Sequence, residues 1–378
     1  MMSRTALSLY LFSFIGIVQL WGRTVIDGTL LNLFSALHGP APYLLPGTQT
    51  PLRSTFTGIY PIDYLLRVLV VFFWEVADGS HPSSSAIGLY FLGQYFSVLV
   101  VFYLENVRHG TGSGLLRLVS SPPTGIGCTG PLWALSHIRH LPGSRRNHLL
   151  RAELQRLSLV PRHVPVVLLA ALTIGYATTA FSMMLPSPRT ISHETKQIAL
   201  AVWNVFPIWV FAAWTVLRFT VHSSARIPQS SAATVHNTAL TKAALSLVYI
   251  PSLILSSLSH TAILGVSMST YLFPVIFRPE YLTDLHPSNV FLPPLTVVAG
   301  ETVGDGTRSF MLWDQLLGYS SVILVMLWQL HSVAALVGNS LSWLKLIAVS
   351  AITSSIIGPG SCCLLICWYK DSLLLPRK

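Results

Sequence analysis

Charged residues are scarce in this chain of 378 residues. Only 10% of the residues are Asp, Glu, Lys or Arg, whereas 52% are hydrophobic and the mean hydropathy is +0.61. A soluble domain usually carries about 25% charged residues, and one ordinary core has no room for many long apolar runs. The composition excludes an ordinary soluble domain and predicts an integral membrane protein that crosses the bilayer several times.

Acidic residues are the scarcer charged class, with 13 Asp and Glu against 23 Lys and Arg and a net charge of +10. The basic residues lie between apolar runs and form no basic face with interleaved aromatic residues. The charge therefore does not indicate a nucleic-acid partner. The tendency of cytoplasmic loops of membrane proteins to be basic accounts for the excess.

Cysteine is also rare, with only Cys128, Cys362, Cys363 and Cys367 in the chain. Three of the four lie in one apolar segment, and none has the spacing or partners of a zinc ligand. We expect free thiols packed in the protein interior.

Several catalytic motifs are missing. The chain has no Asp-Asp-x-x-Asp, no Asn/Asp-x-x-x-Asp, no Asp-x-Asp-Asp, no phosphate-binding Walker loop and no Gly-x-Ser-x-Gly. Their absence disfavours metal-dependent diphosphate chemistry and nucleotide-driven transport, so no cofactor and no metal are expected. No inverted-repeat symmetry is evident either, which weakens the case for a secondary transporter.

Long apolar runs, by contrast, are plentiful, and they predict an all-α, polytopic transmembrane helix bundle of about seven to nine spans. The candidate spans are 6–22, 60–77, 86–104, 164–185, 197–217, 243–258, 262–277, 310–330 and 344–368. The first reads as a retained span rather than a cleaved signal peptide. Segment 29–46 holds three prolines and reads as a re-entrant or interfacial piece. The pair within 243–277 is a tight hairpin or one broken span.

The distribution of Lys and Arg predicts the topology of these nine spans. With loop 105–163 in the cytoplasm, 18 basic residues fall on the cytoplasmic side and 4 on the other, while Arg67 lies within the membrane. This bias supports the arrangement. We expect a multi-pass integral membrane protein of the endoplasmic reticulum or another endomembrane.

Residues 121–158 within that basic loop are atypical. They are rich in Gly, Pro, His and Arg and have little helical or strand periodicity. A long structureless stretch is unusual in a compact bundle. It reads as a cytoplasmic loop, or as a place where the reading frame or splicing departs from an ancestral span.

The predicted second span carries a stripe of charged residues: Asp63, Arg67, Glu75 and Asp78. At about 100° per residue, all four fall on about one third of the helix surface. A charge at membrane depth costs about 2.5–3.5 kcal/mol even on the lenient insertion scale. The stripe must therefore face a protein interior or a wet cavity.

Two interpretations of this stripe stay open. Asp63 and Arg67 are spaced for an ion pair within the helix, with the other acids simply in an interface. Alternatively, Glu75 is an acid in an apolar cavity, where desolvation keeps it protonated and able to donate a proton. Asp78 and His81 would then orient or reprotonate it.

Other polar residues also lie in or near the spans. Asp314 is either an acid at a helix start or a cavity residue, and Glu105 to Arg108 reads as a polar cluster at a helix end. His193 is either a solvated loop residue or part of the site, since the nine-span topology places its loop on the same side of the membrane as Glu75. Most of the aromatic residues in the spans should pack or form interfacial belts, and a subset lining a cavity would suit cationic intermediates.

Four separate stretches together resemble one fungal family, the integral-membrane terpene cyclases of meroterpenoid pathways of the macrophorin and ascofuranone type, with relatives in indole-diterpene clusters. They are Tyr60-Pro-Ile-Asp63 with Phe73-Trp74-Glu75-Val-Ala-Asp78-Gly and His81-Pro82, then Glu105-Asn-Val-Arg108-His-Gly, then Leu185-Pro-Ser-Pro with Ser192-His193 and Gln197, and Phe310 with Trp313-Asp314. The resemblance runs over most of 1–110 and 160–370 and does not extend over 121–158.

The resemblance implies cyclisation of a linear prenyl chain, often attached to an aromatic or polyketide head. An acid protonates a terminal epoxide or olefin, the cation runs along the folded chain, and a base removes the last proton. The residues that match are Asp63, Glu75, Asp78, His81 and Asp314. Implied partners are a lipophilic prenylated substrate, membrane lipid and other enzymes of the same pathway, and no nucleic acid.

Two other functions remain open from the sequence. One is a non-catalytic membrane scaffold of a terpenoid or indole-diterpene cluster. The other is a proton-coupled transporter that uses the same polar stripe. A scaffold tolerates Glu75→Gln, whereas a cyclase that uses this acid loses most of its product.

Overall fold

A computed structural model of the chain describes residues 2–108, 125–140, 159–160, 163–222 and 231–375. These residues form helices joined by turns and irregular segments, and the described part of the chain contains no β-strand beyond one isolated bridge between Leu44 and Pro51. The expectation of an all-α fold is confirmed.

The helices follow one another along the chain in a simple order. They are α1 (Met2–Ile17), the π-helical turn η1 (Val18–Gly22), α2 (Arg23–Ile26), α3 (Thr29–His38), α4 (Tyr60–Ala77), α5 (Pro82–Arg108), α7 (Ile126–His140), α9 (His163–Leu172), the π-helical turn η3 (Thr173–Ala177), α10 (Thr178–Met184), α11 (His193–Asn204), α12 (Phe206–His222), α13 (Ser231–Leu272), the 3-10 turn η4 (Pro274–Ile276), α14 (Pro279–Asp284), α15 (Pro287–Phe291), α16 (Val303–Leu336), α17 (Trp343–Ile357) and α18 (Pro359–Leu374).

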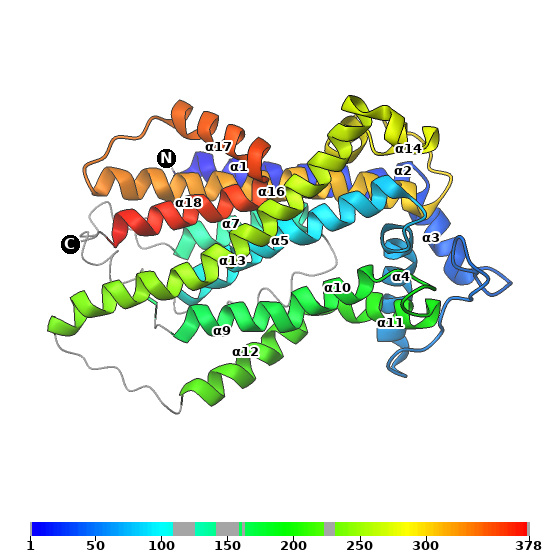
Figure 1. Cartoon of the computed structure of the whole chain (residues 1–378), viewed down its shortest axis with the longest axis horizontal. Coiled ribbons are helices and arrows are strands. Elements are labelled where there is room, and N and C mark those ends of the chain that lie inside the picture. Colours follow the sequence, from blue (N-terminus) through cyan, green and yellow to red (C-terminus); the bar gives the residue numbers. More distant parts are fainter. Residues whose placement is uncertain (1, 109–124, 141–158, 161–162, 223–230, 376–378) are drawn as a thin grey trace.

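The long helices run side by side along the long axis of the molecule (Figure 1). Both termini lie at one end, which we call the α18 end, whereas α2, α3, α4 and α14 gather at the other, which we call the α4 end. Helix α16 is central and packs against α4, α5, α7 and α18. This arrangement leaves α16 in contact with both ends of the bundle.

Five helical segments of the described chain are long and apolar enough to cross a membrane: Leu7–Ile26, Pro82–Arg108, His163–Met184, Leu240–Leu272 and Val303–Leu336. Helices α11 and α12 add a sixth if the pair, bent by 66°, is one span. The expected seven to nine spans are therefore not reached within the described residues. One reason is that 243–277 contains neither a hairpin nor a broken span, because α13 continues without interruption to Leu272.

Helix α4 is a second reason for the lower number. Its bounds match the expected second span, but it carries three charged residues in 18 and runs across the ends of the long helices (Figure 1). Asp63 and Glu75, near the two ends of this helix, therefore lie at the same end of the bundle (Figure 1). Most apolar residues in the second half of this helix are buried, and the helix packs against α11 and α16.

The bundle also separates basic residues that the predicted topology places on one side of the membrane. Arg278 precedes α14 and Arg308 lies in the second turn of α16, whereas Arg108 ends α5 and contacts the last turn of α18. Figure 1 places α14 and the end of α18 at opposite ends of the bundle. The grouping that gave 18 basic residues against 4 put these residues on one side, whereas the bundle holds them at opposite ends (Figure 1).

Residues 126–140 form helix α7, although the sequence predicts a loop across 121–158. Helix α7 packs against α1 and α16. A Cβ on Gly127 or Gly130 would meet α16, and a Cβ on Gly318 of α16 would meet Ile126. Glycines weaken an isolated helix, but in a membrane bundle small residues let two helices approach closely. The rest of 121–158 lies outside the described residues.

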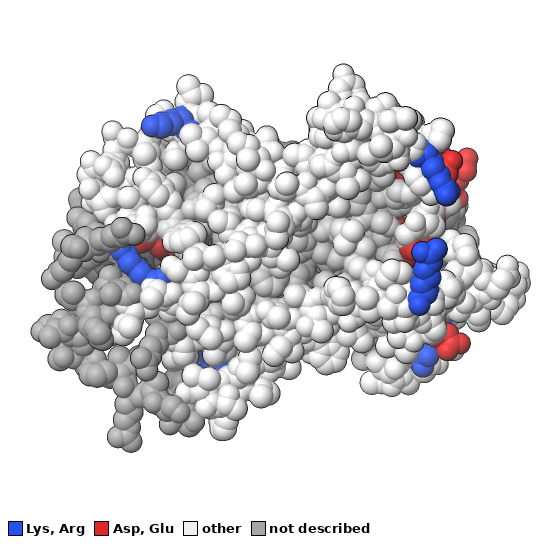
Figure 2. All heavy atoms as spheres, viewed as in Figure 1, with Lys and Arg blue, Asp and Glu red and all other residues white. Residues whose placement is uncertain are grey.

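Charged side chains gather at the two ends of the bundle on the face shown in Figure 2. The surface between the two ends is uncharged on that face. Leu255, Phe181 and Ile352 are among the many large apolar side chains that the described helices expose. Such an apolar belt between two polar ends is typical of a protein embedded in a bilayer.

Candidate active site

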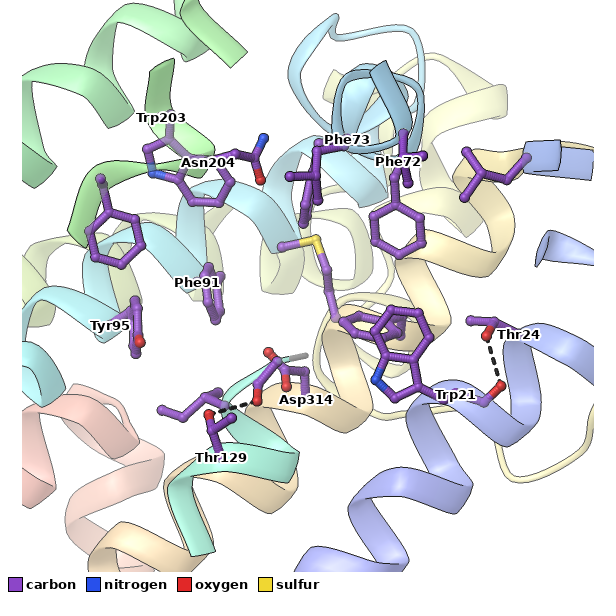
Figure 3. A pocket seen from close by; sticks show the side chains of 18 of the residues that line it. Trp21, Thr24, Phe72, Phe73, Phe91, Tyr95, Thr129, Trp203, Asn204 and Asp314 are labelled. Atoms are coloured by element: carbon purple, nitrogen blue, oxygen red, sulfur yellow. Dashed lines mark hydrogen bonds between the residues drawn. The ribbon is translucent and has the colours of Figure 1, made fainter. Parts of the chain in front are cut away.

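An apolar cavity of about 370 Å³ lies inside the bundle toward the α4 end (Figure 3). This size falls within the range of about 300–1,000 Å³ that is usual for small-molecule sites. Eleven of the 25 lining residues are aromatic: Trp21, Phe34, Tyr64, Phe72, Phe73, Phe91, Tyr95, Tyr103, Trp203, Phe206 and Phe310. The cavity thus presents ring faces to whatever occupies it.

Two irregular helices shape the cavity wall. Trp21 belongs to the π-helical turn that follows α1, and an extra residue in such a turn aims side chains that a regular helix would point elsewhere. Asn204 and Pro207 flank the break between α11 and α12, because proline supplies no N–H to continue the first helix. Both irregularities turn lining residues toward the cavity.

Among the described residues that line the cavity, Asp314 is the only acidic or basic one. It lies on α16 about three turns after the start of the helix and is 5% exposed. Its Oδ1 accepts the backbone N–H of Gly127, in the first turn of α7, at 2.7 Å. The first N–H groups of a helix lack partners within the helix, so the carboxyl group caps α7 from inside the cavity.

Gly125 completes this contact. Its φ of +85° lies in the left-handed region that favours glycine, and a Cβ there would collide with Asp314 Oδ1. The carbonyl of Gly125 accepts the Thr129 hydroxyl at 2.8 Å. The segment that the sequence marks as atypical therefore supplies both the hydrogen-bond donor and the space that the acid needs.

Figure 3 shows how the other labelled side chains face Asp314. Trp203 and Asn204 lie on the opposite wall of the cavity, Phe91 and Tyr95 lie on one flank, and Trp21 lies on the other. The amide nitrogen of Asn204 donates to the carbonyl of Leu200 at 2.9 Å. A molecule in the cavity would have the acid at one wall and ring faces around it.

Glu75 is the second buried acid, with 2% exposure. Its carboxylate accepts the backbone N–H of Gly304 in the first turn of α16 and lies 3.5 Å from the Nδ1 of His81. Burial raises the pKa of Glu75, while the N–H of Gly304 and the nearby His81 act in the opposite direction. Glu75 does not line the cavity, although Phe72, one turn before it on α4, does.

The predicted residues that follow α4 have local roles in the structure. Asp78 accepts hydrogen bonds from the N–H and the hydroxyl of Ser80 at 2.8 Å. Glu75, Asp78 and His81 thus gather at the α4 end, as the sequence predicts. His193 joins them there, because its ring lies 5.9 Å from that of Trp74.

Asp63 lies apart from this group and closes the loop before α4. It accepts the N–H groups of Phe56, Thr57 and Gly58 and the Thr57 hydroxyl at 2.6–3.0 Å. Although burial alone would raise the pKa of Asp63, these hydrogen bonds outweigh it and lower the pKa. No ion pair joins Asp63 to Arg67 among the described residues, and Arg67 donates to the carbonyl of Leu37 instead.

A third polar cluster lies at the α18 end, buried between α5, α7, α13, α16 and α18. Glu105 accepts from Arg108 at 2.6 Å and from Lys370 at 2.7 Å, and Arg108 also donates to Asp371 at 2.6 Å. The sequence predicts the polar end of α5 but not its partners on α18. Among the described residues, no three His, Cys, Asp or Glu side chains group so as to hold a metal ion. The four cysteines are free and buried.

Sequence reasoning missed several residues that build the cavity. It included Asp314 and many of the aromatic residues, but not Trp21, Gly125, Thr129 or Asn204. The one available signal was the combination of Asn204 with Pro207, since a polar residue just before a proline inside an apolar run marks a broken span.

Comparison with known proteins gives a consistent result. The CtvD domain family matches residues 4–375. The chain is 28% identical to terpene cyclase ctvD of Aspergillus terreus over 293 residues, 76% of either chain. It is 26% identical to terpene cyclase ascI of Acremonium egyptiacum over 388 residues, 94% of this chain and 93% of the relative.

Terpene cyclase penA of Penicillium crustosum is 23% identical over 286 residues, 74% of this chain and 73% of the relative. No solved structure matches the chain. The resemblance to fungal terpene cyclases inferred from the four motifs is confirmed, and the chain belongs to the CtvD domain family.

Proposed function

We propose that the chain is a membrane-embedded terpene cyclase that folds a linear prenyl chain in the aromatic cavity and starts cyclisation by protonation from Asp314. One observation carries this proposal: a single carboxyl group projects into a cavity that is otherwise apolar and rich in aromatic rings. The printed names of the relatives support the same class of reaction.

The surroundings of Asp314 suit a proton donor. No Lys or Arg is among the described residues that line the cavity, and a buried carboxyl group without a cation is disfavoured in its charged form. Oδ1 is held by the N–H of Gly127, so a proton on Oδ2 leaves that bond intact. The acid is thereby oriented and still able to release its proton to a terminal alkene or epoxide.

The reaction then depends on the aromatic walls. Protonation places positive charge on the prenyl chain, and each new ring moves that charge along the chain. The face of an aromatic ring within about 6 Å stabilises a cation by about 0.5–2 kcal/mol. Loss of a proton at the end restores the composition of the substrate, so the product is an isomer of the same mass.

Glu75 serves a different purpose in this proposal. It meets α16 at Gly304, ten residues before Asp314, and ten residues of helix span about 15 Å. Glu75 caps the start of α16 and pairs with His81, and so holds the wall that carries Phe72 and Phe310. It remains the second candidate for a proton-transfer residue.

The experiment compares products from cells that make the linear prenylated intermediate. Cells with the wild-type chain should accumulate a cyclised isomer, detected by chromatography and mass spectrometry. Asp314→Asn keeps the acceptor for Gly127 but has no proton to give, so product should fall by about 10²–10⁴-fold. Glu75→Gln should reduce the amount of product by a smaller factor.

The two other functions give different results in the same cells. Full product with Asp314→Asn, at normal protein level, would support the scaffold and overturn the cyclase. No product with the wild-type chain, together with substrate-dependent flux across vesicles, would support the transporter. A larger loss of product with Glu75→Gln than with Asp314→Asn would identify Glu75, rather than Asp314, as the proton donor.

A further inference from the structure

A second cavity of about 560 Å³ lies on the other side of α16. Its walls come mainly from α16, on a stripe that runs from Leu312 to Leu327, and from α17, at Ile347, Ser350 and Ser354. We call it the α16–α17 groove. It shares no lining residue with the aromatic cavity, so it is a separate site.

Gln315 is the unusual residue of this groove. It follows Asp314 directly but lines the opposite side of the helix. The side chain is 5% exposed, and neither its Oε1 nor its Nε2 has a hydrogen-bond partner. A buried polar group without a partner costs about 1–3 kcal/mol, and more where lipid replaces water.

The two tyrosine hydroxyl groups of the groove already have partners. The hydroxyl of Tyr319 donates to the carbonyl of Phe91 at 3.4 Å, and that of Tyr90 lies 3.3 Å from His260 Nδ1. The amide of Gln315 therefore offers one donor and one acceptor to something that enters the groove. A hydroxyl group can bond to both atoms of the amide, because its oxygen accepts one hydrogen bond and donates another.

The position of Gln315 restricts the occupant further. It lies 12 residues after the start of α16, about 18 Å along a helix that continues well beyond a hydrocarbon core of about 30 Å. None of the described residues that line the groove is Lys or Arg, so a phosphate group finds no counter-charge among them at this depth. The occupant must be apolar with a neutral hydroxyl group.

We propose that the α16–α17 groove binds an isoprenoid alcohol, with its hydroxyl on the Gln315 amide and its hydrocarbon body along α17. The alcohol has two sources with the same chemistry, a resident membrane sterol or a prenyl alcohol, linear or cyclised. The site acts beside the aromatic cavity and does not depend on the proposed reaction.

The test uses the full chain in phosphatidylcholine nanodiscs and a C15 isoprenoid alcohol that carries a diazirine and an alkyne. After irradiation, labelled peptides should map to α16 and α17. An excess of unlabelled alcohol should displace the probe, and the hydrocarbon without the hydroxyl should not. A sterol competitor and a linear C15 alcohol, compared at equal concentration, distinguish the two sources.

Two sets of variants make the test specific. Gln315→Met keeps the volume but removes the amide, so labelling should fall at least about tenfold, as expected for a hydrogen bond lost away from water. Ile347→Trp fills the groove from α17 and should also block labelling. Val349→Trp is the matched control, because both residues are about half exposed and only Ile347 lines the groove.

Equal displacement by the alcohol and the hydrocarbon would overturn the proposal, and so would undiminished labelling of Gln315→Met. Asp314→Asn should keep the labelling although it loses cyclisation, so failure of the groove and failure of the proposed reaction give different patterns. If Gln315→Met does not fold, the comparison of Ile347→Trp with Val349→Trp is the test: only Ile347→Trp should reduce labelling, and equal labelling of the two variants would overturn the proposal.

Discussion

At the scale of single residues, the two buried acids are held in the same way. Asp314 accepts an N–H in the first turn of α7, and Glu75 accepts one in the first turn of α16. Each carboxyl group satisfies a helix start that would otherwise lack a partner. Of these two acids, only Asp314 also lines the aromatic cavity. The two acids therefore make the same capping contact, but only Asp314 can reach a molecule in that cavity.

Gly125 is predicted to be essential for the position of Asp314. Gly125→Ala adds a Cβ that meets Oδ1 at a residue with φ of +85°, so α7 or the acid must move. We expect product to fall at least about tenfold, since a misplacement of 1 Å can reduce a rate about 100-fold. Gly265→Ala is the matched control, because a Cβ there meets nothing within 4 Å.

Asp63 makes a testable contribution to stability. Its folded-state pKa is lowered, so its contribution is present above the unfolded pKa of about 3.9 and is lost as pH falls through the lower folded value. At pH 7 in detergent, the melting temperature of the wild type should be higher than that of Asp63→Asn. This difference in melting temperature should disappear below about pH 4. A difference that widens in acid would contradict the direction of the shift.

The sequence predicted residue types better than residue positions. Asp314 and a subset of aromatic side chains were named as candidates because charge and ring faces stand out in apolar runs. The stripe on α4 is expected to face a protein interior or a wet cavity, and the choice stays open because helical periodicity shows which face is polar but not what packs against it. Gly125 escaped notice since its role depends on a contact 189 positions away in the chain.

At the scale of elements, α7 decides whether a cavity exists. The Gly- and Pro-rich composition predicted a loop, since helix propensities measured in water penalise both residues. In the bundle the same glycines allow contact with α16 at Asp314, Gly318 and Ser321. Likewise, α4 has the length of a span but lies across the bundle, because its buried face contacts α11 and α16.

The buried ion cluster at the α18 end fixes α18 to α5. Lys370→Met should lower the free energy of unfolding by about 3–5 kcal/mol, because it leaves Glu105 buried with fewer counter-charges. Arg278→Met breaks an exposed pair, with side chains 76% and 61% accessible, and should change it by less than about 1 kcal/mol. Urea unfolding in mixed micelles compares the two, and equal effects would contradict a structural role for the cluster.

At the scale of the whole molecule, the apolar belt separates two polar ends. Composition alone predicted a membrane protein, and five or six helices of the described chain are apolar enough to cross a bilayer. The number and direction of the spans did not follow from composition, because hydropathy cannot tell a crossing helix from one buried across the bundle. Charge counting grouped Arg278 and Arg308 with Arg108, whereas the bundle holds them at opposite ends (Figure 1).

The two ends should lie on opposite sides of the membrane. Glu280→Cys places a thiol at the α4 end and Ser342→Cys one before α17, at the α18 end. In intact microsomes a maleimide that cannot cross membranes should label one of them, and both after permeabilisation. The four native cysteines are buried, so background should be low. Labelling of both in intact vesicles would contradict the arrangement.

The rate of cyclisation by Asp314→Asn relative to Asp305→Asn tests the central claim most directly. Both acids lie on α16, but Asp305 is exposed in the capping box of the helix and lies outside the cavity. Measured in membranes at equal protein level, Asp305→Asn should stay within about threefold of wild type, whereas Asp314→Asn should lose about 10²–10⁴-fold. Equal rates for the two variants would contradict the assignment of the proton donor to the aromatic cavity.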